Sequence, residues 1–405
     1  MKKQAGLPRD PRNRYRFKNP TFDFFFQWLT GTQTNNGAEL GESMYIASQI
    51  KDGDPESWYR EFMAMGERVE ERAKASLANG HIISARESYL RCYVYYRGAA
   101  AFLNPRSDIR YRQAYGKGRD CFRKGNQLLD LPMEEVYVPF EGKMLPGYFA
   151  RVDGNRNTKR RTLFMIGGGD TFVEDLYYYI VPAALRRNYN VLCVDLPGQG
   201  SLPWEGLYWR ADMETPVKAV VDYALAHFPE IDPDRMAIYG ISGGGYIVPR
   251  AVTREKRFKA CVACSVILNF SQVWDSRIGS VEDALLFRIW RKLQPRRFDS
   301  ILNILATYEW RWGAATINEL VAKTQDHVVD PAQITCATLN LVAEQEYNGF
   351  GAGRRWAEEC LAKITHSRKE LIVAPRNEGG DSHGVGTNLS LMSQIVFDWL
   401  DDTLG

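Results

Sequence analysis

The sequence predicts an α/β fold in which a mostly parallel sheet carries helices on both faces and follows a helical N-terminal domain. Three observations lead to this prediction. From about residue 132 onwards, short apolar runs typical of buried strands alternate with helical segments. Before that point the pattern is helical, without strand alternation. The apolar run that starts at Met236 leads into a Gly-x-Ser-x-Gly turn, which is typical of one large class of α/β proteins.

The composition indicates an ordinary globular protein. The chain has 405 residues, of which 45% are hydrophobic and 25% charged, which is enough for more than one domain. A formal net charge of +3 is too small over this length to indicate a nucleic-acid partner. No stretch reads as a signal peptide or a membrane span, and seven cysteines without regular spacing fit reduced thiols. We therefore expect a cytoplasmic protein with no nucleic-acid or membrane partner.

Residues 1–131 are expected to form the helical domain. In this part Tyr89, Tyr93 and Tyr96 recur at three- and four-residue steps, which places them on one face of a helix. Aromatic stripes of this kind usually belong to a protein core.

Residues 132–405 are expected to form the α/β domain. Strand-like runs begin with EEVYVPF and end with KELIVAP, and an amphipathic helix from about Leu389 to Leu400 closes the chain. The segment from Ile231 to Arg235 reads as a turn that delivers the chain into the strand before the Gly-x-Ser-x-Gly motif. A helical, tryptophan-rich stretch at about residues 266–330 interrupts the pattern where such folds insert a cap.

Ser242 stands at the centre of the motif, and its hydroxyl needs a histidine to take its proton and a carboxylate to orient that histidine. In this fold class the chain order is serine, acid, histidine. Of the five histidines, His327, His366 and His383 follow Ser242. His383 lies in a glycine-rich loop after the last predicted strand and is the expected base, whereas His327 and His366 lie in polar segments and are expected at the surface.

The orienting acid is expected in the loop after the predicted strand that starts at Ala337. That loop offers Glu344 and Glu346. We expect Glu346, because it comes later in the loop and has room to turn towards His383. Asp381 is the rival candidate, since it lies two residues before His383 in the sequence.

A reacting carbonyl also needs two backbone N–H donors for its developing negative charge. Gly243, directly after the serine, supplies one, and Gly168 or Gly169 in the glycine run after an earlier strand supplies the other. Asp170 follows that run, so its carboxylate should lie near the reacting centre, where burial would raise its pKa. It is either an acid that protonates a leaving group or positions water, or a loop residue satisfied by neighbouring N–H groups.

The chain resembles the FrsA-like branch of the α/β-hydrolases over most of its length. Within that branch it is similar to 2,6-dihydroxypseudooxynicotine hydrolase and to fungal hydrolases that shorten polyketide pigments. The resemblance implies that the N-terminal helices cover the active site and help to form a homodimer. It places the nucleophile on Ser242, the base on His383, the acid on Glu346 and an extra acid on Asp170. The motifs that carry it are Ser84–Arg91, Ile166–Asp175, Val194–Gly200, Gly240–Tyr246 and Glu378–Asn388.

The similar enzymes break a carbon–carbon bond next to a ketone, so the resemblance implies the same reaction on an aromatic or polyketide-like ketone. Aromatic side chains that could line the site of a flat substrate are Phe25, Trp28, Tyr246 and Trp274. The mechanism needs no metal and no organic cofactor.

Two alternatives stay open. The same triad could serve an ester, lactone or thioester hydrolase, or an acyltransferase, without the extra acid. The fold could also be catalytically idle and act as a binding or regulatory protein.

Overall fold

The computed structural model describes residues 13–273, 295–349 and 352–405. Two compact units divide the chain, Met1–Pro132 with Asp275–Trp310 and Met133–Trp274 with Arg311–Gly405. The sequence places all of residues 266–330 in the second domain, whereas part of that stretch packs with the N-terminal helices. The side-chain amide of Asn303 donates to the carbonyl of Phe102 (2.7 Å), and Trp310 packs edge-on against Tyr111.

The first unit is helical, and buried aromatic rings form its core. Asn19 and Asp54 cap two of its helices by accepting hydrogen bonds from N–H groups of the first turn. Trp58 packs against Phe22 and Phe102 with ring centroids 4.8 and 4.9 Å away. The predicted tyrosine stripe is buried, which confirms it as core. The helices are α1 (Pro20–Gly31), α2 (Leu40–Gln49), α3 (Pro55–Ala78), α4 (Ile82–Ala99), α5 (Ile109–Gln127) and, except for its last residue, α11 (Pro295–Arg311).

The second unit contains an eight-stranded sheet in the order β1-β2-β4-β3-β5-β6-β7-β8. The pairs β1–β2 and β2–β4 are antiparallel and the other pairs are parallel, so the sheet is mostly parallel, as the sequence predicts. One boundary differs, because Ile231–Arg235 already belongs to β5 instead of forming a turn before it. The strands are β1 (Glu134–Phe140), β2 (Lys143–Ala150), β3 (Arg160–Ile166), β4 (Asn190–Val194), β5 (Ile231–Ile241), β6 (Ala260–Cys264), β7 (Ala337–Ala343) and β8 (Lys369–Ala374).

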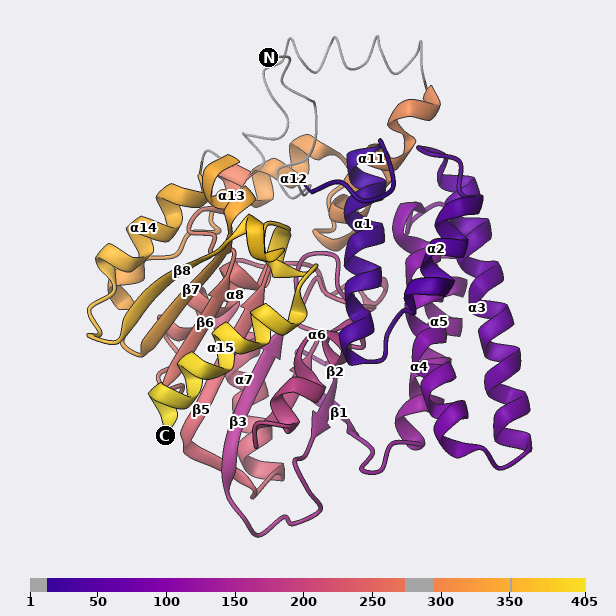
Figure 1. Ribbon diagram of the computed structural model, residues 1–405. Helices are drawn as coiled ribbons and strands as arrows, with labels where there is room; N and C mark the ends of the chain where they lie inside the picture. Colours follow the sequence, from indigo (N-terminus) through magenta and orange to yellow (C-terminus); the bar gives the residue numbers. More distant parts are fainter. Residues whose placement is uncertain (1–12, 274–294, 350–351) are drawn as a thin grey trace. The chain divides into compact units, whose positions relative to one another are not determined.

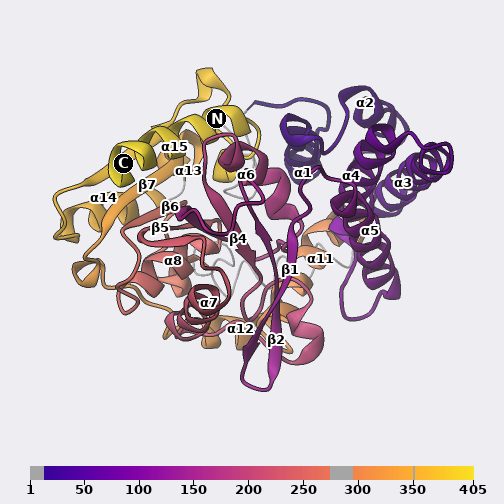
Figure 2. The same cartoon turned by 90° about the horizontal axis from the view of Figure 1, so that it is seen from below.

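Helices cover both faces of this sheet. Figure 2 shows α6 and α15 on one face and α7 and α8 on the other. Strands β4 and β6 are buried along their whole length and, apart from Asn190 at the start of β4, are apolar because both faces are covered. The helices are α6 (Asp175–Leu185), α7 (Glu214–His227), α8 (Gly244–Val252), α12 (Ile317–Lys323), α13 (Glu344–Gly349), α14 (Gly353–Lys363) and α15 (Leu389–Leu404), and most are labelled in Figure 1.

Across the described ranges, no helix combines the length and the apolar character that a membrane crossing requires.

Candidate active site

Ser242 occupies a sharp turn between β5 and α8. Its backbone has φ 58°, a left-handed conformation that is strained for a residue with a side chain. The turn needs glycines around it. A Cβ at Gly240 would lie 2.2 Å from the carbonyl oxygen of Gly244, and one at Gly244 would lie 2.8 Å from that of Ile166. The Gly-x-Ser-x-Gly pattern therefore has a direct steric reason, and the half-buried serine lies at the tip of the turn.

A continuous chain of hydrogen bonds joins Ser242, His383 and Glu346. His383 Nε2 lies 2.7 Å from Ser242 Oγ, and His383 Nδ1 is hydrogen-bonded to Glu346 Oε1. His383 begins a short 3-10 turn after β8, and Tyr179 donates a 2.8 Å hydrogen bond to the carbonyl of the next residue, Gly384. The structure thus brings together the three residues that the sequence predicts as nucleophile, base and acid.

Glu346 lies in the first turn of α13, where the sequence predicts a loop. Strand β7 ends at Ala343 and the chain turns at once into this short helix. The second oxygen of Glu346 accepts a 2.6 Å hydrogen bond from Ser265 Oγ. Burial raises the pKa of Glu346, but His383, Ser265 and the N–H of Gly384 together hold it below its ordinary value. The carboxylate is therefore ionised at neutral pH and able to orient the imidazole. Glu344 instead accepts from the N–H of Arg376 (2.7 Å).

Strand topology explains why residues so far apart in the sequence meet. Ser242 follows β5, Glu346 follows β7 and His383 follows β8, and these strands are parallel members of one sheet. The carboxyl ends of parallel strands lie along the same edge, where active sites of open α/β sheets form.

The glycine run after β3 reaches the same edge. A Cβ at Gly168 would lie 2.8 Å from Ser242 Cβ, and a Cβ at Gly243 would lie 2.8 Å from the backbone nitrogen of Gly169. These close approaches place the predicted N–H donors next to the serine, and glycine is required for the backbones to come so near. Asp170 follows directly and is half-buried.

The predicted substrate-binding residues are spread over the chain. Tyr246 in α8 is fully buried, and its hydroxyl donates a 2.6 Å hydrogen bond to the carbonyl of Ala211. Phe25 and Trp28 lie on α1 in the first unit, where Phe25 is buried against Phe102 and the guanidinium of Arg97 lies over the half-buried Trp28. Trp274 lies outside the described residues. A role for these four side chains in substrate binding stays a prediction.

The prediction that His327 is at the surface is wrong. Its side chain is buried in an aromatic cluster, with ring centroids 4.5 Å from Trp312, 5.4 Å from Tyr246 and 6.2 Å from Phe270. Burial lowers the pKa of His327 to about 4, so the ring is neutral at physiological pH. The polar sequence around it misled the prediction, because most side chains of α12 and of the loop that follows it are exposed or half-buried.

Ser265 is a site residue that the sequence reasoning missed. It follows β6 directly, the strand beside β5, and its φ of 66° turns the hydroxyl towards Glu346. The available signal was a polar residue at the carboxyl end of an apolar strand, next to the strand that carries the nucleophile.

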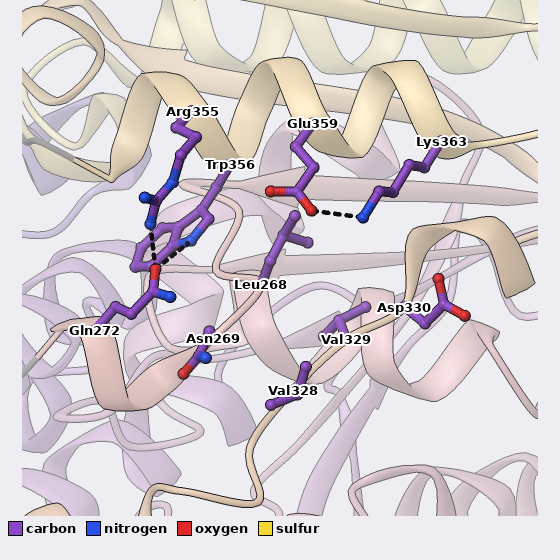
Figure 3. Close-up of a pocket in the computed structure, with 10 residues that line it drawn as sticks. All are labelled: Leu268, Asn269, Gln272, Val328, Val329, Asp330, Arg355, Trp356, Glu359 and Lys363. Atoms are coloured by element: carbon purple, nitrogen blue, oxygen red, sulfur yellow. Dashed lines mark hydrogen bonds and ion pairs between the residues drawn. The ribbon is translucent and has the colours of Figure 1, made fainter.

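A cavity of about 450 Å³ lies elsewhere in the second unit, between α14 and the segment after β6 (Figure 3). Neither the serine nor its hydrogen-bonded partners are among its lining residues. Arg355 and Trp356 both contact Gln272, and Lys363 pairs with Glu359 at 2.7 Å. Because these polar groups pair with one another, the cavity presents no set of converging polar groups, and we do not assign it to the reaction.

Comparisons with known proteins agree with this fold. Hydrolase LUC6 from a Fusarium species is 31% identical over 96% of this chain and 98% of its own length. The 20-hydroxy-prefusarin hydrolase FUS2 from Gibberella moniliformis is 30% identical over 96% of this chain and 97% of its own. This chain belongs to the FrsA-like family of α/β-hydrolases.

Two further matches concern the fold. The model of the prolyl oligopeptidase family matches residues 181–278, which include the serine turn. The crystal structure of 2,6-dihydroxy-pseudo-oxynicotine hydrolase matches with a TM-score of 0.73 and 19% identity over 92% of this chain and 95% of that one. Together they support an α/β-hydrolase preceded by a helical region.

Proposed function

We propose that this hydrolase uses Ser242 to cleave a carbon–carbon bond next to a ketone in an aromatic or polyketide-like substrate. The observation that supports a serine mechanism most strongly is the hydrogen-bonded chain from Ser242 through His383 to Glu346. Its geometry favours Glu346 over Asp381 as the acid, since Glu346 accepts the hydrogen bond of His383 Nδ1.

In the proposed first step, Ser242 Oγ adds to the ketone carbon while His383 Nε2 takes the hydroxyl proton. The carbonyl oxygen becomes an alkoxide, which the N–H groups of Gly243 and of Gly168 or Gly169 stabilise. Glu346 stays ionised and stabilises the positive imidazolium. The required reach is present, because Nε2 and Oγ are 2.7 Å apart.

In the second step the alkoxide collapses and the bond to the leaving carbon breaks. The leaving carbon departs as an enolate or aryl carbanion and takes a proton either from the imidazolium of His383 or from a protonated Asp170, which then regains a proton from that imidazolium, so that His383 is neutral again in both cases. Water, deprotonated by His383, then hydrolyses the acyl-enzyme and releases the carboxylic acid. A variant in which activated water adds directly to the ketone gives the same products.

The choice of a carbon–carbon bond rests on the relatives and on Asp170. FUS2 is named for 20-hydroxy-prefusarin, and the solved hydrolase for a pseudo-oxynicotine. Asp170 lies directly after the glycine loop and is half-buried, and we propose that its carboxyl group acts at the reacting centre. The alternative, an ester, lactone or thioester hydrolase, uses the same residues without a proton donor for carbon. The homodimer, the cytoplasmic location and the cap role of residues 1–131 stay predictions.

Product analysis separates these reactions. Wild-type protein and Ser242→Ala are incubated with aromatic β-diketone polyketides and with matched esters, and products are identified by mass spectrometry, with Ser48→Ala as an exposed control. Shortened ketide products that disappear in Ser242→Ala support the proposal. Cleavage of esters alone assigns the protein to the esterases. If a fluorophosphonate probe fails to label Ser242 in folded protein, the favoured explanation becomes a catalytically idle fold that acts as a binding or regulatory protein.

The Asp170→Asn variant tests the extra acid. If Asp170 protonates the leaving carbon, carbon–carbon cleavage should fall far more than hydrolysis of an activated ester, whose leaving group needs no proton on carbon. Equal losses on both substrates would show that Asp170 is structural.

A further inference from the structure

Gln199 lies in the loop after β4, and its side chain is fully buried. Its Nε2 donates to the carbonyl oxygen of Gly167 at 2.6 Å and to that of Gly168 at 3.1 Å. Its Oε1 accepts a 2.9 Å hydrogen bond from the N–H of Leu196. The side-chain amide has two donors and one acceptor oxygen, so the backbone engages both ends of the group. The side chain is locked in one orientation.

The two carbonyls that Gln199 holds belong to the peptide units that carry the N–H groups of Gly168 and Gly169. In a trans peptide the C=O and the N–H point in opposite directions. Fixing both carbonyls towards Gln199 therefore directs both N–H groups away from it. The serine turn approaches this segment closely, because Gly169 N lies 2.8 Å from the position of a Cβ on Gly243.

The glycine run cannot hold this orientation by itself. Gly167, Gly168 and Gly169 have no side chains to restrict their backbone, and glycine has the widest conformational freedom of all residues. Thr171 Oγ1 contributes a weaker hydrogen bond to the Gly168 carbonyl, at 3.3 Å. Gln199 makes the two shorter hydrogen bonds, one to each of the two carbonyls.

We propose that Gln199 is a positioning residue for the oxyanion hole, which keeps the N–H groups of the glycine run directed at the developing alkoxide before substrate binds. This inference rests on the proposed serine mechanism. Preorganised donors stabilise a transition state because they need no reorientation during the reaction. Loss of the two hydrogen bonds from Gln199 would leave the nucleophile and its base intact, but it would allow the peptide units of the glycine run to rotate.

The test replaces Gln199 by methionine, which has a similar length and shape without the amide. Turnover of an activated aryl ester and affinity for an aryl trifluoromethyl ketone, which forms a tetrahedral adduct with serine, are measured together. Removing a single oxyanion donor costs roughly 10²- to 10³-fold in kcat, so a misdirected donor should cost roughly 10- to 100-fold. The ketone affinity should fall by a similar factor, while KM should change by less than about threefold. The control is Gln325→Met at an exposed position in the same unit.

The pH profile of kcat/KM adds a readout that a disturbed fold would not leave intact. It should keep its shape in Gln199→Met, because Ser242, His383 and Glu346 are unchanged. A thermal unfolding curve checks that the variant is folded. If Gln199→Met does not fold, Gln199→Asn, shorter by one methylene, takes its place in the same comparison.

The outcomes distinguish this inference from the proposed function. A folded variant with unchanged kcat, or with a raised KM as its main defect, overturns the role of Gln199 and leaves the serine mechanism standing. If wild-type protein itself neither hydrolyses the ester nor binds the ketone, the serine mechanism fails, and the role of Gln199 fails with it. A loss in kcat and ketone affinity with an unchanged pH profile supports both.

Discussion

Replacing His327 by phenylalanine should remove part of the acid sensitivity of the fold. His327 is enclosed by aromatic rings, and burial lowers its pKa to about 4 from an ordinary value of 6.5. The positive charge of Arg250 acts in the same direction, while the backbone of Arg210 and the carboxylate of Asp326 oppose it. Phenylalanine has a similar shape and fits the cluster, but it cannot take up a proton.

The direction of the stability change with pH follows from which state, folded or unfolded, binds the proton of His327 more readily. Between pH 6.5 and pH 4 the unfolded chain binds a proton on His327 that the folded protein does not, so the folded state loses stability as the pH falls through this window. At pH 5 the loss relative to neutral pH amounts to about 2 kcal/mol. It reaches about 3 kcal/mol near pH 4.

Urea denaturation followed by tryptophan fluorescence at pH 7, 6 and 5 measures this effect. The wild-type free energy of unfolding should fall by about 2 kcal/mol more than that of His327→Phe between pH 7 and pH 5. His227→Phe, at an exposed position in α7, is the control and should follow the wild type. Equal pH slopes in wild type and His327→Phe would refute the reasoning.

Three further predictions concern the site. Glu346→Gln should lower kcat by roughly 10²- to 10⁴-fold, because the imidazolium loses its charged partner, while Glu344→Gln, measured in parallel with the same ester, should change it little. Ser265→Ala removes the 2.6 Å hydrogen bond to Glu346 and should lower kcat by about tenfold without loss of fluorophosphonate labelling; a kcat equal to wild type would show that Ser265 does not orient the acid. Gly168→Ala places a methyl group 2.8 Å from Ser242 Cβ, so probe labelling should slow by at least about tenfold, and labelling at the wild-type rate would contradict the close approach.

The parts of this structure that the sequence could predict are those that depend on residues close to one another in the chain. Ser242 was recognisable because the whole Gly-x-Ser-x-Gly pattern of its turn lies within five consecutive residues. His383 was recognisable because glycines flank it after the last strand. The alternation of apolar strands with helices predicted the sheet for the same local reason, since both faces of the central strands are covered.

The remaining features depend on which strands become neighbours. Ser265 reaches Glu346 because β6 and β7 pair, and no sequence spacing of 81 residues could indicate that contact. The hydrogen bonds from Gln199 to the glycine run connect the loop after β4 with the loop after β3, and Gln199 lies 32 residues after Gly167 in the sequence. His327 was misplaced because two of the three aromatic rings that bury it, those of Tyr246 and Phe270, come from distant parts of the chain.

The order in which the site is assembled has a consequence for synthesis. Ser242 and its turn are made before β6, β7 and β8, and the imidazole that we propose to receive its proton comes 141 residues later. A ribosome adding roughly 5 to 20 residues per second needs on the order of ten seconds to cover that distance. During this interval the nascent chain carries Ser242 without His383, so the proposed mechanism cannot yet operate. Under the proposed mechanism, a chain truncated before β8 would carry Ser242 without the base that accepts its proton and should be inactive.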